Sequence, residues 1–264
     1  NLELLIVHCL QQQVSIYTPS DYGLGSEISY KELDRFLEGD FKGVPKSKQI
    51  ESIYRLSGLQ QGMLFHSLYD KRSDAYIEQF SCNVIAPDVE VFKKSWIRIL
   101  NSHSILRSSF DHDSFGIPVQ CVYRDVELPF KILDFQDKED KAKEIEKFEE
   151  SDRAIGFDFN SPPLMRITLI RLSGDHYRMI WTSHHLLFDG WSLQVLIEEL
   201  LSIYEAELTD QKIILHIDHY QDYIRYLERV DHEGEEIYWR NYLKELTPST
   251  CMPFISNNNQ RNKG

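Results

Sequence analysis

The residues best suited to chemistry lie between positions 183 and 192, in the run Ser-His-His-Leu-Leu-Phe-Asp-Gly-Trp-Ser. Imidazole is the side chain whose ordinary pKa lies nearest neutrality, so a histidine can take a proton from an attacking amine or hydroxyl. His184 and His185 can also be read as core residues that only satisfy hydrogen bonds. Asp189 and Gly190, a few residues further on, favour the reactive interpretation.

The histidine pair lies at the end of a predicted strand, residues 177–185, just before a predicted helix. Adjacent strand residues point to opposite faces of a sheet, so His184 and His185 cannot both reach one substrate. One ring should therefore be buried and structural, and the other should face a cleft. Asp189 also has a simpler interpretation, because Asp before Gly is common at helix N-caps and in turns.

Two other kinds of site can be built from the same residue types. A Ser-His-Asp triad would use Ser192, His185 and Asp189. Ser192 is more simply a first-turn helix residue, however, and no nucleophile-elbow sequence surrounds it. A metal site would combine the histidine pair with a distant His66 or His103, and the spacing does not support one. We therefore expect no metal.

Composition limits what the chain can bind and where it can work. Its 264 residues are 42% hydrophobic and 12% aromatic, which is ample for a packed core. With 42 acidic against 29 basic residues the formal charge is −13, which repels phosphate backbones, so we expect no nucleic-acid partner. The four cysteines lie far apart without a CxxC pair, which favours a reducing, cytoplasmic setting. No apolar run is long enough to span a bilayer, so we expect no membrane partner.

The predicted elements around the histidine pair alternate between strand and helix. Apolar residues recur at helical spacing in several segments, and short stretches rich in β-forming residues lie between them. Because strands and helices intermingle, we expect an α/β (α+β) two-layer sandwich. Helices are predicted at 30–37, 59–69, 89–100, 138–153 and 193–204, with two amphipathic helices near 220–227 and 239–246, and strands at 78–85, 118–123, 164–172 and 177–185.

The ends of the chain differ from its middle. The chain begins at Asn1 inside a helix-like apolar stretch, which indicates a piece of a longer protein. The stretch from Gly39 to Lys48 is polar and contains glycine and proline, which predicts a linker. Residues 247–264 are expected to be irregular.

The run from His184 to Gly190 resembles the HHxxxDG motif of the condensation-domain superfamily, relatives of chloramphenicol acetyltransferase. Two further stretches occur in the order that the family has. Residues 56–66, Leu-Ser-Gly-Leu-Gln-Gln-Gly-Met-Leu-Phe-His, are similar to its opening motif, and residues 102–110, Ser-His-Ser-Ile-Leu-Arg-Ser-Ser-Phe, resemble its second. Because three motifs occur in the order of the family, the resemblance is specific. It covers residues 50–247.

The resemblance implies one lobe of a two-lobed condensation domain from a nonribosomal peptide synthetase, with a chloramphenicol acetyltransferase-like fold. Upstream, Tyr-Thr-Pro-Ser-Asp-Tyr at residues 17–22 looks like the end of an epimerization domain. The implied boundaries are the tail of a preceding epimerization domain at 1–40, a linker at 41–49, the N-terminal lobe at 50–247, and the start of the connection to the C-terminal lobe at 248–264.

The resemblance also implies roles for single residues. His185, as the second histidine of the motif, carries catalysis, either by deprotonating an amine or by orienting it and stabilising the charge that develops. His184 is the buried partner. Asp189 is structural and pairs with Arg107 of the second motif, which makes physical sense because a guanidinium can hold a buried carboxylate bidentately. Gly190 allows a tight turn into the following helix.

The implied reaction is the attack of the amine of an acceptor aminoacyl thioester on a donor peptidyl thioester. Both would be held on phosphopantetheine arms of carrier proteins, and no cofactor would be bound directly. The Gln-Gly-Met-Leu-Phe-His form of the opening motif is typical of domains that accept a D-configured donor. Adjacent epimerization and adenylation domains of the same megaenzyme would be partners, and the isolated fragment is expected to be inactive.

Three alternatives stay open at this point. An epimerization domain shares the His-His and Asp-Gly residues, although Trp191-Ser192 after Gly190 argues against it. A stand-alone acyltransferase of the same superfamily would use a free alcohol or amine as the acceptor. A scaffold that only docks carrier proteins would need no catalytic residue.

Overall fold

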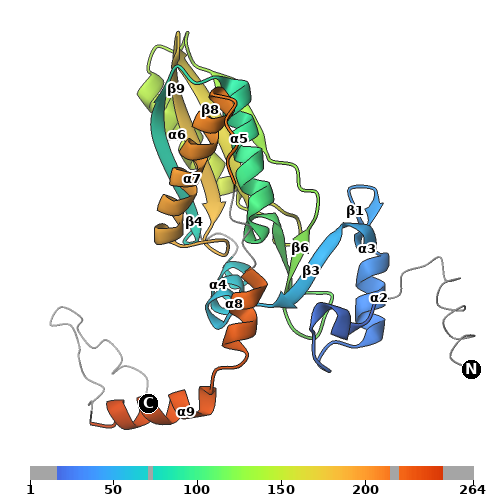
Figure 1. The fold of residues 1–264 in the computed structure, drawn as a ribbon. Helices are drawn as coiled ribbons and strands as arrows, with labels where there is room; N and C mark the ends of the chain where they lie inside the picture. Colours follow the sequence, from blue (N-terminus) through green and yellow to red (C-terminus); the bar gives the residue numbers. More distant parts are fainter. Residues whose placement is uncertain (1–16, 71–73, 215–219, 246–264) are drawn as a thin grey trace, which may run out of the picture. The chain divides into compact units, whose positions relative to one another are not determined.

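The structure is a computed structural model that describes residues 17–70, 74–214 and 220–245. The chain divides into two compact units, residues 1–224 and 225–264, and each is described by itself. The first unit contains the three sheets of the described residues, and the second contains helix α9 (His232–Leu243). Helix α8 (Tyr220–Leu227) crosses the boundary between the units (Figure 1).

A four-stranded sheet forms the centre of the first unit, with the strand order β4-β9-β8-β7 (Figure 1). The β4–β9 and β9–β8 pairs are antiparallel, and the β8–β7 pair is parallel. Helices α5 and α7 cover one face, and α6 lies on the other. The bounds are β4 Ile77–Ile85, β7 Phe130–Asp134, β8 Met165–Ser173, β9 His176–His184, α5 Val89–Ser102, α6 Lys141–Ile155 and α7 Gly190–Leu208.

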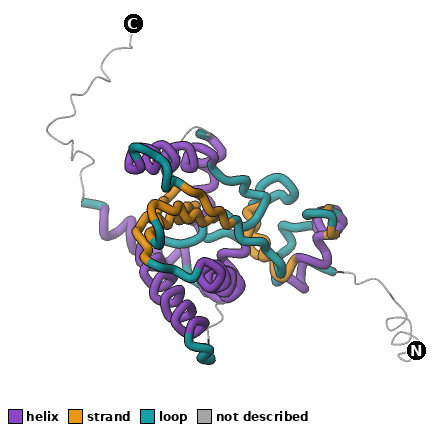
Figure 2. The backbone as a smooth tube through the Cα atoms, turned by 90° about the horizontal axis from the view of Figure 1, so that it is seen from above, coloured by secondary structure: helices purple, strands orange, loops and turns teal. Residues whose placement is uncertain are grey.

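Two adjacent residues of β9 show how both faces of this sheet are covered. The ring of Trp181 packs against Trp96 of α5 at 4.7 Å between centroids. The hydroxyl of Thr182, on the opposite face, donates to Asp152 of α6 at 2.6 Å. In Figure 2 the strands accordingly run between helices. The central residues of β8, Ile167 to Ile170, are accordingly all buried.

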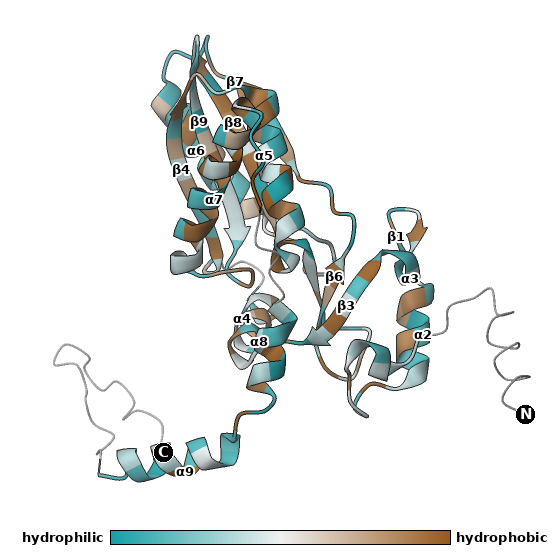
Figure 3. Cartoon of the chain, viewed as in Figure 1, coloured by the Kyte–Doolittle hydropathy of each residue, from teal (hydrophilic) through white to brown (hydrophobic). Residues whose placement is uncertain are grey.

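The helices over this sheet have one apolar side. Along α5, hydrophobic and hydrophilic residues alternate around the helix in Figure 3. Its buried apolar residues are Phe92, Trp96, Ile99 and Leu100. On α7 the buried stripe consists of Leu196, Leu200, Ile203 and Ala206, whereas Leu201 is exposed. The mixed α/β lobe that the sequence predicts is confirmed, with α6 as an additional cover on the second face.

A three-stranded antiparallel sheet, β3-β6-β5, carries a second hydrophobic core. Residues from 17 to 41 pack against it: Phe36 lies 5.0 Å from Phe115, and Phe41 lies 4.7 Å from Tyr123 between ring centroids. The bounds are η1 Pro19–Tyr22, α2 Tyr30–Glu38, β3 Ile50–Arg55, α4 Gly58–Tyr69, η2 Ser104–Arg107, β5 Ser108–Asp111 and β6 Val119–Tyr123.

The segment expected to be a linker, residues 41–49, is folded instead. Strands β1 (Asp40–Phe41) and β2 (Val44–Pro45) form a hairpin, and α3 (Lys46–Gln49) follows. The two loop residues, Lys42 and Gly43, have φ values of 52° and 80°. Two positive φ values are what a type I′ hairpin loop requires, so the polar, glycine-containing stretch is a tight turn.

Among the described helices, none has both the length and the hydropathy to cross a bilayer. The helix-like stretch at the start of the chain and the irregular tail from residue 247 lie outside the described residues.

Candidate functional site

The candidate site is the loop that joins β9 to α7, residues 184–189, called the His loop below. Asp189 ends the loop as the N-cap of α7, and its Oδ1 accepts hydrogen bonds from the backbone N–H and the hydroxyl of Ser192, at 2.9 and 2.8 Å. The backbone hydrogen bond, followed by the hydroxyl, lowers the pKa of the Asp189 carboxyl. The carboxylate therefore stays charged and fixes the first turn of α7.

His184 is buried, with 3% of its surface exposed. Its Nδ1 accepts from the backbone N–H of Leu186 at 3.1 Å, so the ring proton lies on Nε2. Nε2 lies 3.3 Å from the hydroxyl of Ser67, which itself donates to the carbonyl of Met63 at 2.9 Å. Burial, with a smaller effect from the charge of His185, lowers the pKa of His184 to about 4. The ring is therefore a neutral structural part of the loop.

His185 occupies a different environment from its neighbour, since 32% of its side chain is exposed. Its backbone N–H donates to the carbonyl of Tyr76 at 2.8 Å, which extends the pairing of β9 with β4 by one residue. Its Nδ1 lies 3.1 Å from Oε1 of Glu78, which is ion-pair distance. The direction of approach is not that of a hydrogen bond, so Nδ1 is buried without a hydrogen-bond partner among the described residues.

A pocket of about 310 Å³ opens beside the His loop. Its wall includes the first residue of α7, Gly190, and the residue before the histidine pair, Ser183. Glu78 is thus both part of the pocket wall and the nearest carboxylate to His185. The pocket is lined by Glu78, Gln79, Phe80, Trp181, Ser183, Gly190 and Leu193.

The predicted ion pair between Asp189 and Arg107 does not form in this structure. Asp189 is exposed, and the start of α7 satisfies its carboxylate. Arg107 is buried in another part of the unit, where Nη1 donates to Glu51 at 2.8 Å and to the carbonyl of Tyr123. The ion pair was expected because a buried carboxylate needs a partner, and the carboxylate of Asp189 is not buried.

The role expected of Gly190, and the residues of the two alternative sites, can be compared with the structure. Gly190 has no positive φ and no crowded Cβ position, so the turn into α7 does not itself require glycine. The hydroxyl of Ser192 donates to Asp189 rather than to His185, so the residues of the imagined triad are not connected in that order. His103 pairs with Glu199 at 2.6 Å. Within the described ranges, no group of three or more His, Cys, Asp and Glu could hold a metal ion.

Helix α4 holds the His loop through residues that sequence reasoning missed. Gln60 is 3% exposed, and its Nε2 donates to the carbonyl of Leu186 and to Oε1 of Gln120, both at 3.2 Å. Gln120 in turn donates to the hydroxyls of Tyr54 and Ser108, both at 2.8 Å. The capping-box spacing of Ser57 and Gln60 in the sequence predicts that Gln60 lies in the first turn of α4. It does not reveal the distant partners of Gln60.

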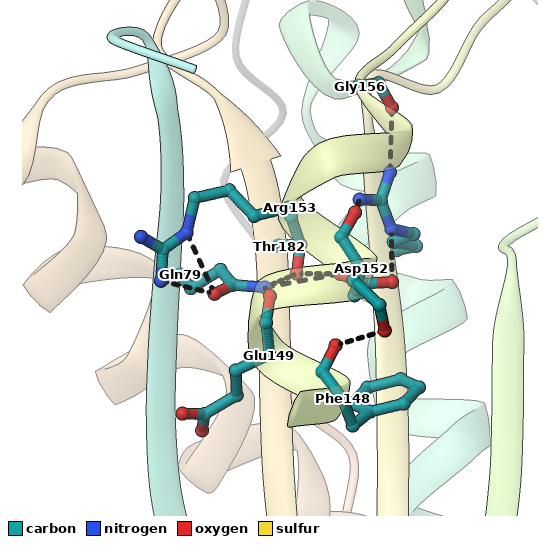
Figure 4. Close-up of polar contacts among 9 residues, drawn as sticks. Gln79, Phe148, Glu149, Asp152, Arg153, Gly156 and Thr182 are labelled. Atoms are coloured by element: carbon teal, nitrogen blue, oxygen red, sulfur yellow. Dashed lines mark hydrogen bonds and ion pairs between the residues drawn. The ribbon is translucent and has the colours of Figure 1, made fainter. Parts of the chain in front are cut away.

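A second missed cluster, centred on Asp152, anchors α6 to the sheet next to the His loop (Figure 4). The Asp152 carboxylate accepts from Thr182 at 2.6 Å, from Arg166 at 2.8 Å and from Gln79 at 3.3 Å. The Arg166 guanidinium also lies over the ring of Phe157 at 4.5 Å, and that ring meets His184 edge-on at 6.5 Å. The cluster therefore supports the side of the His184 ring that faces α6.

The fold is thus a mixed sheet covered by helices on both faces, with a buried and an accessible histidine at the end of one strand. The sequence model of the family described as Condensation domain matches residues 50–263. The chain belongs to this family.

Two relatives are large synthetases. The chain is 36% identical over 259 residues to bacitracin synthase 1 of Bacillus licheniformis, covering 96% of the chain and 5% of that protein. It is 36% identical over 259 residues to bacitracin synthase 3 of the same organism, covering 97% of the chain and 4% of that protein. The chain thus spans a small part of the length of these relatives.

Solved structures of similar fold include two condensation domains. The starter condensation domain of rhizomide synthetase has a TM-score of 0.66 and 16% identity, over 75% of this chain and 49% of that one. The first condensation domain of the calcium-dependent antibiotic synthetase, solved with a substrate analogue, has a TM-score of 0.63 and 19% identity, over 76% and 51%. At such identities the likeness establishes the fold.

Proposed function

We propose that the chain contributes the N-terminal lobe of a peptide-bond-forming condensation domain in a nonribosomal peptide synthetase. The substrates are a donor peptidyl or aminoacyl thioester and the amine of an acceptor aminoacyl thioester. Family membership and the identity to the bacitracin synthetases support this proposal. The observation that carries it is the partly exposed ring of His185 at the end of β9, next to Glu78, which lines a pocket.

The reaction exchanges one bond for another at the donor carbonyl. The acceptor nitrogen bonds to the carbonyl carbon, the carbon–sulfur bond breaks, and the thiolate leaves with the electron pair of that bond. The amine loses one proton and the thiolate gains one, so no oxidant or further reactant is needed. His185 either takes the proton from the amine or orients the amine while the proton leaves by another route.

Tethering of the two substrates accounts for much of the rate acceleration. Two reactants held on carrier arms in one site react as parts of one assembly, which lowers the entropic part of the barrier. The carriers present phosphopantetheine, so the lobe itself binds no separate cofactor. His184 keeps the loop in shape through its neutral ring, and Asp189 fixes the start of α7.

The finer assignments follow from the resemblance. Donor and acceptor carrier domains and adenylation and epimerization domains of the same protein are the proposed partners, the donor is D-configured, and the setting is cytoplasmic. Residues 1–40 are proposed to be the end of an epimerization domain, on the likeness of residues 17–22. His184, Asp189, Gly190 and Arg107 are proposed to shape the active site, with His185 as the catalytic residue.

Replacing His185 by Ala in the complete two-lobed module tests the proposal. With loaded donor and acceptor carriers, the rate of condensed product should fall by roughly 100- to 10,000-fold, because a proton-transfer or orienting group is lost. His176→Ala, an exposed histidine at the other end of β9, is the matched control and should leave the rate unchanged. An unchanged rate in His185→Ala would contradict the catalytic role of His185 and favour positioning of the substrates by the scaffold alone. The chain alone, lacking the second lobe, should give no product in the same assay.

A further inference from the structure

The nearest carboxylate to the proposed catalytic ring comes from another strand. In the antiparallel pairing of β4 with β9, Glu78 lies opposite Ser183. His185 is two residues beyond Ser183, so Glu78 and His185 are diagonal neighbours on one face, within reach of each other's side chains. This explains the 3.1 Å between Oε1 of Glu78 and Nδ1 of His185.

Nδ1 of His185 and the carboxylate of Glu78 are available to interact with each other. Asp189, the carboxylate that the sequence places near the histidines, is committed to Ser192. Within the described part of the chain, Nδ1 of His185 is buried and has no hydrogen-bond partner. The side chain of Glu78 is 43% exposed, faces the pocket and makes its ion-pair contact with His185.

We propose that Glu78 is a positioning residue that holds the Nδ1 side of His185, so that Nε2 is the ring atom presented to the acceptor amine. The proposal rests on the proposed function. A carboxylate at Nδ1 favours the tautomer with the proton on Nδ1 and leaves the Nε2 lone pair free. It also stabilises the positive charge that the ring gains when it takes a proton, because Coulomb attraction does not need hydrogen-bond geometry.

The kinetic test compares three variants in the complete two-lobed module with loaded carriers. Glu78→Gln keeps the shape and removes the charge, and kcat should fall roughly 10- to 100-fold with little change in the KM for the acceptor carrier. Glu78→Asp keeps the charge and should retain more activity than Glu78→Gln. Glu139→Gln, which removes an exposed carboxylate in the loop before α6, is the control for net charge.

A spectroscopic test separates positioning from catalysis. In the 264-residue chain labelled with ¹⁵N at its histidine rings, the His185 signal, assigned by its loss in His185→Gln, should report a protonated Nδ1. In Glu78→Gln the Nε2-protonated tautomer should gain population. Unfolding temperatures within a few degrees of wild type would show that the variants are folded.

The outcomes are distinguishable. An unchanged tautomer in Glu78→Gln overturns the positioning role, and a fall in kcat without a tautomer change would mean that the carboxylate acts on the substrate instead. A shifted tautomer in a module whose kcat does not change supports the contact but removes His185 from the chemistry. The catalytic role of His185, and with it the positioning role of Glu78, then fails, while the module still forms peptide bonds.

Discussion

At the scale of single residues, two identical side chains next to each other have opposite properties because of where β9 places them. His184 is enclosed by aromatic rings and accepts a backbone hydrogen bond, whereas His185 is partly exposed and lies next to a carboxylate. The alternation of a strand was enough to predict that one ring is buried and one accessible. It could not predict Glu78, which comes from a strand about a hundred residues earlier in the chain and meets His185 only through strand pairing.

The buried ring of His184 should make stability depend on pH. Its pKa is about 4 in the folded chain and 6.5 ordinarily, so the unfolded chain binds more protons at intermediate pH. The stabilising contribution is therefore complete above pH 6.5 and is lost as the pH falls from 6.5 towards 4. Between pH 7 and pH 5 this amounts to about 2 kcal/mol of unfolding free energy.

His184→Asn isolates this contribution, because an amide can accept from Leu186 but does not titrate. Urea unfolding at pH 7 and pH 5 should show wild type losing about 2 kcal/mol more than the variant. His176→Asn, at an exposed position, should behave like wild type. Equal losses in wild type and His184→Asn would mean that the buried ring is not responsible.

At the scale of elements, α4 is the clearest case of a segment whose role depends on partners distant in sequence. It was predicted as a helix from its periodicity, and its bounds, Gly58–Tyr69, are close to those expected. Its contribution to the site comes from Gln60 and Ser67, which contact the His loop. A glutamine in the first turn of a helix gives no local sign that it reaches a loop far along the chain.

Replacing Gln60 by Leu should loosen the His loop. The carbonyl of Leu186 and the Oε1 of Gln120 would both lose their donor in a buried setting, which costs about 1–3 kcal/mol of unfolding free energy. Hydrogen exchange of the His loop amides should also become faster than in wild type. Gln211→Leu, an exposed glutamine after α7, is the control and should change neither measurement. Wild-type stability and exchange in Gln60→Leu would contradict this role.

Strands β3, β5 and β7 were not predicted, and β5 shows why. Its sequence, Ser-Ser-Phe-Asp, is mostly polar, yet all four residues are buried. The hydroxyl of Ser108 accepts from Gln120, and the Asp111 carboxylate accepts from Ser114. Polar residues can be buried when such partners satisfy them, and hydrophobic periodicity does not detect this. The long strands β8 and β9, in which aliphatic and aromatic residues alternate with polar ones, were predicted to within one residue at each end.

At the scale of the whole molecule, the first unit has two hydrophobic cores on two sheets. The composition and the mixture of elements predicted an α/β fold, which the structure and the family confirm. They did not predict that residues from 17 to 41 form a core with β3 and β6. A polar stretch with glycine and proline is typical of linkers and of tight hairpins alike, and here the pairing of β1 with β2 and the packing of Phe41 on Tyr123 distinguish them.

Truncation of Phe36 tests whether this N-terminal segment is part of the fold. Phe36 is 4% exposed and packs on Phe115, with the ammonium of Lys46 over its ring at 4.0 Å. Phe36→Ala should lower the free energy of unfolding by about 3–5 kcal/mol, measured by urea denaturation. Tyr30→Ala, in the first turn of the same helix but exposed, should cost much less. A loss below about 1 kcal/mol for Phe36→Ala would mean that the segment folds independently.

The cluster around Asp152 sets a rule for exchanging parts between related synthetases. Its carboxylate takes one partner each from β4, β8 and β9, in the side chains of Gln79, Arg166 and Thr182. In a chimera of two related proteins whose junction lies anywhere between residues 79 and 182, the residues of this cluster would come from both parents. Junctions outside that interval keep the whole centre from one parent, so they are the better places to recombine such lobes.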